Sequence, residues 1–188
     1  MAPVSLTWLR ALDRPDLLAP STAAALTSWA STRPEVADEV RVAEIDPDLA
    51  DTAAMTEAYG RPLSASVNCV LVAGRRAGDE RIAAAAVRAT TRADVNNAVK
   101  RLLDVRKASF LPMDRAVADS GMEYGGITPL GLPPEYRVLV DASVQQPHPD
   151  SGEPVIIGSG LRRSKLLLPG ALLASAPGVE VVDGLALG

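Results

Sequence analysis

The sequence predicts an α/β domain with a mixed, mainly antiparallel central sheet and flanking helices. Short apolar, β-branched segments alternate along the chain with segments whose apolar residues have helical spacing. Some neighbouring strands are separated only by a tight turn, which favours antiparallel pairing, and others by a helix, which permits parallel pairing. The chain has 188 residues, of which 47% are hydrophobic and 22% charged, so one domain with a small additional lobe has enough apolar material for a core.

Residues 1–36 are predicted to form a helical N-terminal extension, and residues 37–188 the main domain. The extension is rich in Ala, Leu, Ser and Thr, and its leucines have the spacing of one or two short amphipathic helices. Pro15 and Pro20 would interrupt these helices, because proline lacks the N–H group that a helix interior needs.

The main domain is expected to open with a strand at residues 40–45 and a helix at residues 48–59. Asp48 can act as the N-cap of this helix by accepting a hydrogen bond from its first turn. Gly60 can end the helix, because glycine readily adopts the left-handed conformation that follows a helix. A strand and then a helix therefore precede the central part of the chain.

A β-hairpin is expected next. Residues 67–73 are mostly apolar and β-branched and are followed by Gly74, a pattern that predicts a buried strand. Residues 75–80 predict a charged turn. Residues 81–90 predict a second strand, which would pair with the first in antiparallel orientation.

The remaining elements follow from short apolar runs and from cap residues. Residues 91–94 fit a capping box with Asp94 in the acidic role, which would open a helix that reaches Leu103. Further strands are expected at residues 107–111, 136–141, 155–158, 165–168 and 179–182. Further helices are expected at residues 113–120 and 169–175, and loops at residues 121–131 and 145–154.

The composition excludes several functional classes. The chain carries 19 Lys and Arg residues against 23 Asp and Glu residues, a net charge of −4, which argues against a broad surface that coats a nucleic-acid duplex. A local cationic groove is still compatible with this balance. No apolar run approaches the roughly 20 residues that a membrane helix needs. The first residues do not resemble a secretory signal, so a cytoplasmic protein without a membrane partner is expected.

The scarcity of cysteine and histidine narrows the chemistry further. The single cysteine, Cys69, cannot form an intramolecular disulfide and cannot supply a cysteine-rich metal site. The single histidine, His148, stands between two prolines, which is a poor place to hold a general base. Catalytic zinc sites mostly use two or three imidazoles. We therefore expect neither a metal ion nor another cofactor.

A glycine-rich loop is the first candidate for a site. Gly125 and Gly126 are adjacent, and Pro129 follows three residues later and stiffens the loop. Two glycines allow unusual backbone conformations, so that neighbouring N–H groups can converge on an anion or a developing oxyanion. Thr128 can add a hydroxyl donor. The alternative is an ordinary turn that connects a helix to a strand.

Polar residues inside apolar strands are further candidates. Asn68 needs hydrogen-bond partners, which are either a ligand or a neighbouring backbone. Cys69 points to the opposite face of the strand and is expected to be a core residue. Asp141 ends a strong strand, and we expect it to accept backbone N–H bonds and anchor the glycine loop rather than act as a general base. Arg162, Arg163 and Lys165 form a dense cationic cluster, which would either contact phosphates or belong to a solvated turn.

These motifs resemble the YbaK family, whose domain occurs free-standing and also as the editing domain inserted in bacterial prolyl-tRNA synthetases. The resemblance is carried by residues 125–131, by the strand at 138–141 and by residues 158–163. The G-x-x-x-P loop of the family matches residues 125–129. The order of the elements matches from about residue 40 to residue 186.

The resemblance implies the editing-domain fold and a trans-editing activity. Proteins of this family hydrolyse the ester that joins a wrong amino acid to the 3′-terminal adenosine of a tRNA. The backbone of the loop would receive the ester carbonyl, and the substrate's own ribose hydroxyl would assist the attacking water. The expected partners are the aminoacylated 3′ end of a tRNA and an aminoacyl-tRNA synthetase, and no cofactor is implied.

The resemblance also implies the site residues. The expected catalytic residues are Asn68, Gly125, Gly126, Ile127 and Thr128. The expected substrate-binding residues are Pro129, Gly131, Asp141, Gly158, Ser159, Gly160 and Arg162. Many family members carry a lysine on the strand where this chain has Asn68, which can donate and accept hydrogen bonds but carries no charge.

Two alternatives to the deacylase hypothesis stay open, and the neutral side chain at position 68 motivates the first of them. The chain can be a catalytically silent module that binds an aminoacyl-tRNA or a synthetase. It can also hydrolyse another small ester or a thioester.

Overall fold

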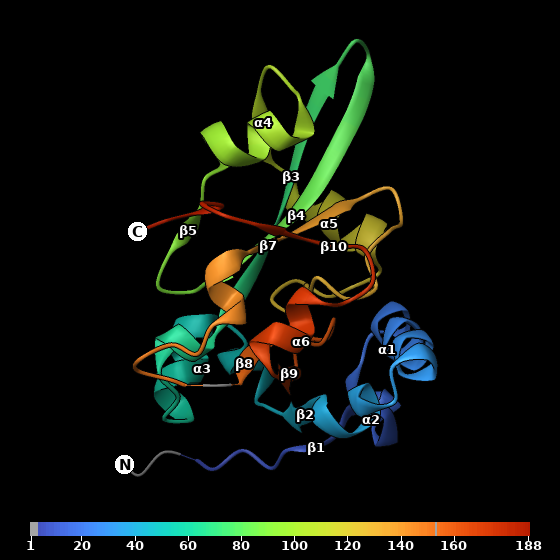
Figure 1. Cartoon of the computed structure of the whole chain (residues 1–188). Coiled ribbons are helices and arrows are strands. Elements are labelled where there is room, and N and C mark those ends of the chain that lie inside the picture. The colour runs from blue at the N-terminus through green and yellow to red at the C-terminus, as the bar shows by residue number, and fades with distance from the viewer. Residues whose placement is uncertain (1–3, 153) are drawn as a thin grey trace.

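The computed structural model describes residues 4–152 and 154–188. Its longest strands have ten residues each and are β3 (Val67–Arg76) and β4 (Asp79–Arg88). They pair in antiparallel register over their whole length, as the hairpin prediction requires (Figure 1). The turn is shorter than predicted. It consists of Ala77 and Gly78, both with positive φ, the conformation that matches the twist of the two strands.

The hairpin lies at the centre of a five-stranded mixed sheet in the order β10-β7-β4-β3-β6. The added strands are β6 (Ala108–Phe110), β7 (Arg137–Asp141) and β10 (Val179–Val182). The β10–β7 and β7–β4 pairs are parallel, because helical segments connect these strands, and the β3–β6 pair is antiparallel.

A second sheet has the order β1-β2-β9-β8 and is antiparallel throughout. Its strands are β1 (Leu9–Arg10), β2 (Arg41–Glu44), β8 (Val155–Gly158) and β9 (Ser164–Leu168). A small third sheet pairs β5 (Arg92–Ala93) with β11 (Ala186–Leu187). The predicted fold class, a mixed and mainly antiparallel α/β domain, is confirmed.

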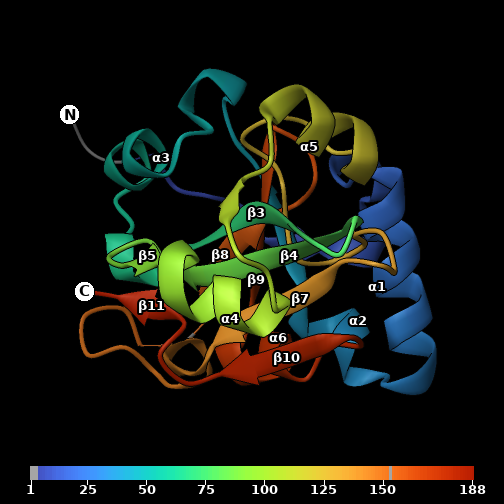
Figure 2. The ribbon, with the colours of Figure 1, turned by 90° about the horizontal axis from the view of Figure 1, so that it is seen from above.

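Helices flank these sheets, and Figure 2 shows α1 and α2 along one side of the molecule and α5 on another. The α-helices are α1 (Pro20–Thr32), α2 (Glu35–Glu39), α3 (Thr52–Ala58), α4 (Lys100–Leu103), α5 (Met113–Ser120) and α6 (Gly170–Ala174). A π-helical turn at Val95–Val99 leads into α4. Short 3-10 helices lie at Ala11–Asp13, Pro15–Leu17, Pro47–Leu49, Leu63–Ala65 and Ala142–Gln145. None of the helices in the described part of the chain has the length and apolar character needed to cross a bilayer.

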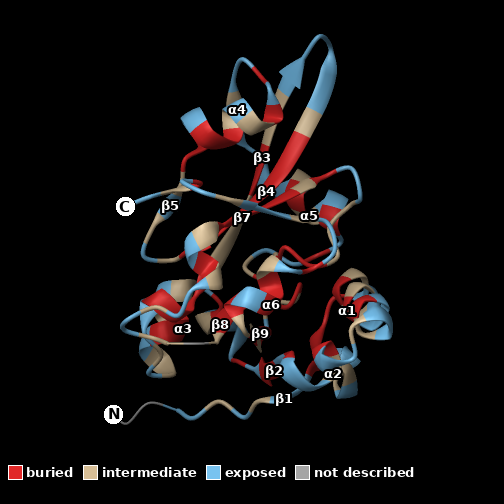
Figure 3. Ribbon diagram, in the orientation of Figure 1, coloured by how far each residue is buried: buried red, intermediate tan, exposed pale blue. Residues whose placement is uncertain are grey.

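Strand β4 is buried on both faces, which explains its run of alanines. The side chains at positions 83–86 are all fully buried. Ala83 and Ala85 belong to an apolar cluster with Val99 of the π-helical turn, whereas Ala84 belongs to a cluster with Ala116 of α5. Small side chains let these neighbours approach both faces of the strand closely. Figure 3 shows the buried middle of β4 beside the exposed tip of the hairpin.

Helix α1 (Pro20–Thr32) is one of the predicted helices, whereas the first part of the N-terminal segment differs from the prediction. Its leucine spacing predicts helix, but the chain forms strand β1, which extends the second sheet by pairing with β2, and then two short 3-10 helices. Pro15 and Pro20 stand in the first turns of helices, where the missing N–H costs nothing, so they start helices rather than interrupt them. Residues 1–3 of the predicted extension lie outside the described residues.

Two predicted helix caps are also wrong. The residues that cap are Asp46, which accepts from the Asp48 amide, and Asp51, which accepts from the Ala53 amide, because a 3-10 turn precedes α3. The predicted capping box at residues 91–94 is instead strand β5, held by β11. Asp94 itself caps the π-helical turn by accepting from the Asn97 amide. The other predicted strands and helices are present to within a few residues.

Arg88 ties the end of β4 to two neighbouring segments. Its side chain is buried and donates hydrogen bonds to the carbonyl groups of Ser64, Ser143 and Gln146.

We predict that Arg88→Leu lowers the free energy of unfolding by about 3 kcal/mol, because the buried carbonyl groups lose their donor. Urea unfolding measures this change. Arg101→Leu, on the exposed surface of α4, should change the free energy by less than about 0.5 kcal/mol, and an equal effect of both substitutions would contradict the prediction.

Candidate functional site

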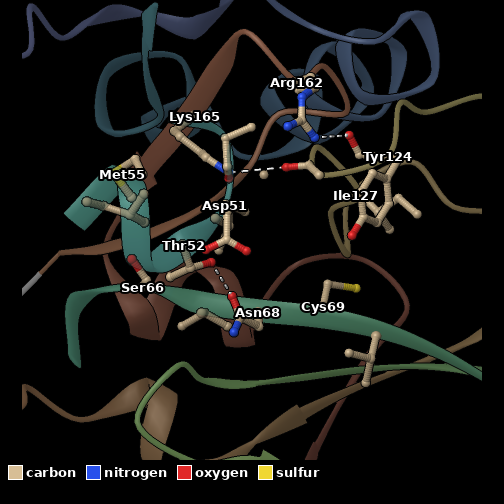
Figure 4. Close-up of a pocket in the computed structure, with 17 residues that line it drawn as sticks. Asp51, Thr52, Met55, Ser66, Asn68, Cys69, Tyr124, Ile127, Arg162 and Lys165 are labelled. Atoms are coloured by element: carbon tan, nitrogen blue, oxygen red, sulfur yellow. Dashed lines mark hydrogen bonds between the residues drawn. The ribbon is translucent and has the colours of Figure 1, made fainter. Parts of the chain in front are cut away.

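A cavity of about 470 Å³ lies where the two sheets, the start of α3 and the glycine loop meet (Figure 4). Strand β3 forms one wall with Asn68 and Cys69, and Lys165 of β9 forms the opposite wall. Asp51 and Thr52 line it from the beginning of α3. The size is typical of a pocket for a small ligand.

The glycine loop is held flat against the turn between β8 and β9. Gly126 donates its amide proton to the Glu123 carbonyl and accepts at its own carbonyl from the Gly160 amide, at 2.9 and 2.8 Å. A Cβ atom at Gly126 would lie 2.5 Å from the carbonyl carbon of Leu161. A Cβ atom at Gly158 would overlap the Gly126 carbonyl oxygen. Only glycine at these positions allows the two backbones to lie in contact.

Gly125 and Ile127 both line the cavity, and Gly125 has a positive φ of 82°. The Gly126 amide is used within the loop. Among the described residues, the amides of Gly125 and Ile127 donate to no backbone carbonyl. These two amides are therefore available as donors, and so within the described residues is the amide of Tyr124, which also lines the cavity.

Lys165 lines the cavity as a buried side chain rather than as part of a surface cluster. The lining residues that sequence analysis does not name as candidates include Asp51, Thr52, Ser66 and Tyr124. Its side chain is only 6% exposed, and its Nζ donates to the carbonyl groups of Ala50 and Gly125 at 2.9 and 3.2 Å. Burial lowers the pKa of this ammonium from 10.5 to about 8, while Asp51 acts to raise it and Arg162 to lower it. A lone lysine within an apolar strand was the available signal, but it was grouped with the neighbouring arginines.

The predicted cationic cluster is divided in the structure. Arg162 lies at the edge of the cavity, where its guanidinium carbon is 5.9 Å from the centre of the exposed Tyr124 ring. Its backbone amide donates to the Glu123 carboxylate at 2.6 Å. Arg163 points elsewhere and donates to the Asp16 carbonyl at 2.6 Å. With Lys165 buried, no shared phosphate-binding surface is formed by the three side chains.

Asn68 is oriented by the first turn of α3. The Thr52 hydroxyl donates to the Asn68 Oδ1 at 2.8 Å. Within the described residues the Asn68 Nδ2 group donates to nothing, and Asn68 lines the cavity. The predicted placement of an uncharged amide on the cavity wall is therefore seen in the structure.

Two other residues with reactive side chains line the cavity. Burial raises the pKa of the Cys69 thiol to about 12, so this thiol is protonated near neutral pH. Ser66 is 3% exposed, and its Oγ has no hydrogen-bond partner among the described residues. His148 lies in a loop outside the cavity lining. Neither Ser66 nor Cys69 therefore has a histidine base.

The structure places five of the predicted site residues on the cavity. They are Asn68, Gly125, Ile127, Gly158 and Arg162. Others support the loop from behind. Gly160 binds the Gly126 carbonyl, and the buried Ser159 hydroxyl bonds to the Ser164 hydroxyl and carbonyl within the β8–β9 turn.

The remaining predicted residues lie away from the cavity lining. Thr128 and Pro129 are buried, and Gly131 packs against the backbone of Ser21. Asp141 does not anchor the glycine loop. Its carboxylate caps the 3-10 helix Ala142–Gln145 by accepting from the Ser143 amide and hydroxyl, and it also accepts from the Ala186 amide of β11. Its partner belongs to the C-terminal strand, which the sequence pattern does not reveal.

Comparison with protein families gives one match. The model of the aminoacyl-tRNA editing domain matches residues 46–175, a range that contains every residue of the cavity lining. A comparison with curated protein sequences gives no match.

Three solved structures are similar over most of the chain. A hypothetical protein has a TM-score of 0.70 and 21% identity, and the match covers 87% of this chain and 99% of that one. A scaffold used for computational epitope grafting has a TM-score of 0.67 and 21% identity, with 91% and 100% covered. A candidate trans-editing enzyme for prolyl tRNA synthetase has a TM-score of 0.67 and 19% identity, with 91% and 99% covered. At these identities the likeness shows the fold.

The contact between the glycine loop and the β8–β9 turn leads to a prediction about stability. Gly126→Ala should lower the free energy of unfolding by about 1–3 kcal/mol, because the added methyl group overlaps the Leu161 backbone. Chemical denaturation measures this loss. Gly188→Ala, where the Cβ atom would meet nothing within 4 Å, is the control and should be neutral. A neutral Gly126→Ala would show that the loop can move away without cost.

Burial of Lys165 leads to a prediction about pH. The unfolded chain holds this proton up to about pH 10.5 and the folded chain up to about pH 8, so between these values the unfolded state binds more protons. The stability contribution of Lys165 therefore rises with pH above 8, by up to about 1 kcal/mol for each pH unit. Urea unfolding of wild type and of Lys165→Met between about pH 7 and 9.5 measures this contribution as the difference between their two stability curves. Parallel pH curves for the two proteins would refute the assignment.

Proposed function

Because the chain belongs to the aminoacyl-tRNA editing domain family, we propose that it is a deacylase that cleaves the ester between an amino acid and the 3′-terminal adenosine of a mischarged tRNA. The observation that carries this proposal is the cavity, where a glycine bend and the amide of Asn68 face a common space. The likeness to a candidate trans-editing enzyme for prolyl tRNA synthetase supports action in trans, on tRNAs charged by such a synthetase.

Ester hydrolysis passes through a tetrahedral intermediate whose carbonyl oxygen becomes negative, and the site must stabilise that charge. The available amides of Gly125 and Ile127 and the Nδ2 group of Asn68 are the donors that would do so. Thr52 would keep the Asn68 amide in the donating orientation. The Gly126 amide is engaged with Glu123, so in this proposal Gly126 shapes the loop rather than binding the oxyanion.

The proposed nucleophile is water, assisted by the ribose hydroxyl next to the ester. The Cys69 thiol is protonated near neutral pH, and a thiol is a much weaker nucleophile than a thiolate. Ser66 would need a base, and the histidine of the chain lies outside the cavity lining. These features support a mechanism in which the protein holds and polarises the ester and the substrate supplies the activating hydroxyl.

The edge of the cavity suits the terminal nucleotide. Arg162 provides a positive charge for a phosphate, and the Tyr124 ring is 57% exposed beside it. An exposed aromatic ring can stack on a base. We therefore assign these two residues to the terminal adenosine and its phosphate.

A panel of tRNAs, each charged with a wrong amino acid, tests the proposal. Wild type should release the amino acid from at least one of them faster than spontaneous hydrolysis. Asn68→Ala should lower the single-turnover rate constant about 100-fold, because one donor to the oxyanion is lost. The measurement is release of labelled amino acid under single-turnover conditions.

Asn96→Ala is the matched control, because Asn96 is exposed on the π-helical turn and outside the cavity lining. It should have wild-type activity. Failure of wild type to accelerate hydrolysis of any tRNA in the panel would refute the deacylase proposal. Measurable tRNA affinity without hydrolysis would instead identify a binding module.

A further inference from the structure

Two oppositely charged side chains line the cavity without pairing with each other. Both hydrogen-bond partners of the Lys165 ammonium among the described residues are carbonyl oxygens, so one of its three N–H bonds is unused. The Asp51 carboxylate accepts from the Ala53 amide at Oδ1, and its Oδ2 has no partner within the described part of the chain. In Figure 4 the Asp51 carboxylate lies between Lys165 and the Thr52–Asn68 hydrogen bond.

The same cavity contains a third polar group, the Ser66 hydroxyl. The Ser66 Oγ is buried and bonds to none of the described residues, although an unpaired buried hydroxyl costs about 1–3 kcal/mol. Ser66 lines the cavity together with Asp51 and Lys165. A polar molecule that enters the cavity can satisfy all three groups at once.

We propose that Asp51 and Lys165 bind the two polar groups of the aminoacyl moiety, with the Asp51 carboxylate accepting from the α-ammonium and the Lys165 ammonium donating to the ester carbonyl oxygen. This inference rests on the proposed function and names its substrate class, esters of amino acids whose α-amino group is free. An aminoacyl ester carries an ammonium one carbon away from a polarised carbonyl. A carboxylate and an ammonium that face one cavity unpaired are complementary to that arrangement.

The proposal predicts discrimination against N-blocked esters, such as N-acylated aminoacyl and peptidyl esters. Acylation removes the positive charge that Asp51 would bind and leaves the carboxylate facing a neutral amide. A hydrogen bond to a charged group contributes about 1.5–3 kcal/mol, which corresponds to at least tenfold in affinity. Lys165 would act on free and blocked esters alike, because both keep the ester carbonyl.

The charges around the pair come from three elements. Asp51 precedes α3, Arg162 lies in the β8–β9 turn, and Lys165 lies within β9. Arg162 repels the Lys165 ammonium, and Asp51 attracts it. Asp51 is the acidic residue among those that line the cavity, so it is the group that can bind a cation there.

Binding of a stable analogue tests Asp51 without requiring turnover. The probe is 3′-(L-alanylamino)-3′-deoxyadenosine, in which an amide replaces the ester, and its N-acetyl derivative is the blocked form. Isothermal titration calorimetry with wild type should give a Kd at least about tenfold lower for the free-amine probe. Asp51→Asn should lower the affinity for the free-amine probe to that for the acetylated probe. The affinity for the acetylated probe should not change.

Asparagine is an effective N-cap, so Asp51→Asn keeps the helix cap while removing the charge. Asp48→Asn is the matched control, since Asp48 is exposed one turn earlier and outside the cavity lining. It should bind both probes as wild type does. Equal affinity of wild type for the two probes, no binding of the free-amine probe, or equal weakening of both by Asp51→Asn would overturn the proposal.

Lys165 is tested by turnover of whichever tRNA ester the panel shows to be cleaved, in its free and N-acetylated forms. Lys165→Met should lower kcat about 100-fold on both forms, because the carbonyl contact strengthens as the oxygen becomes negative. Lys107→Met, at an exposed lysine outside the cavity, should have no effect. An unchanged kcat for Lys165→Met would refute the carbonyl contact.

The two proposals fail in different ways. If no tRNA ester is cleaved, the deacylase proposal fails. The analogue titration still decides whether the cavity binds an α-ammonium selectively. If esters are cleaved but free and blocked forms react and bind alike, the deacylase proposal stands and the role of Asp51 is refuted.

Discussion

The bridge that Lys165 makes between the Ala50 and Gly125 carbonyl groups holds the cavity together. It joins strand β9, the entry to α3 and the glycine loop, three segments that are distant in sequence. A buried ammonium is costly unless oxygen atoms surround it, so both carbonyl groups must stay in place while it is charged. The position of the loop's remaining amides therefore depends on a side chain from the opposite wall.

This bridge can form only because glycines let the backbones approach each other. The Gly126 carbonyl accepts from Gly160, and its amide donates to Glu123, so the loop is closed from both sides before any ligand enters. Gly158 lies directly beneath the Gly126 carbonyl, where a side chain would displace the loop. The glycines thus act through packing. The groups that can hydrogen-bond to a ligand are the amides and side chains that this packing leaves unpaired.

Sequence analysis predicted the elements well where a single segment contains the signal. The hairpin, with its β-branched first strand, and the helix that Gly121 ends are examples. It failed where a partner from elsewhere decides the outcome: β5 is a strand because β11 pairs with it, and Asp141 binds the distant Ala186 amide. Sequence analysis groups Lys165 with its arginine neighbours, because the local pattern does not show that β9 begins at Ser164, after both arginines, and is buried where Lys165 lies.

The neutral side chain at position 68 is consistent with the charges that surround it. Asn68 and Lys165 line opposite walls of one cavity, and Arg162 adds a second cation at its edge. A lysine in place of Asn68, as the resemblance to the family would suggest, would bring a third cation into a space with one unpaired carboxylate, Asp51. Repulsion among buried like charges is strong in a low-dielectric cavity. The amide keeps a hydrogen-bond donor on this wall without adding a charge, and the positive charge of the cavity comes from Lys165 and Arg162.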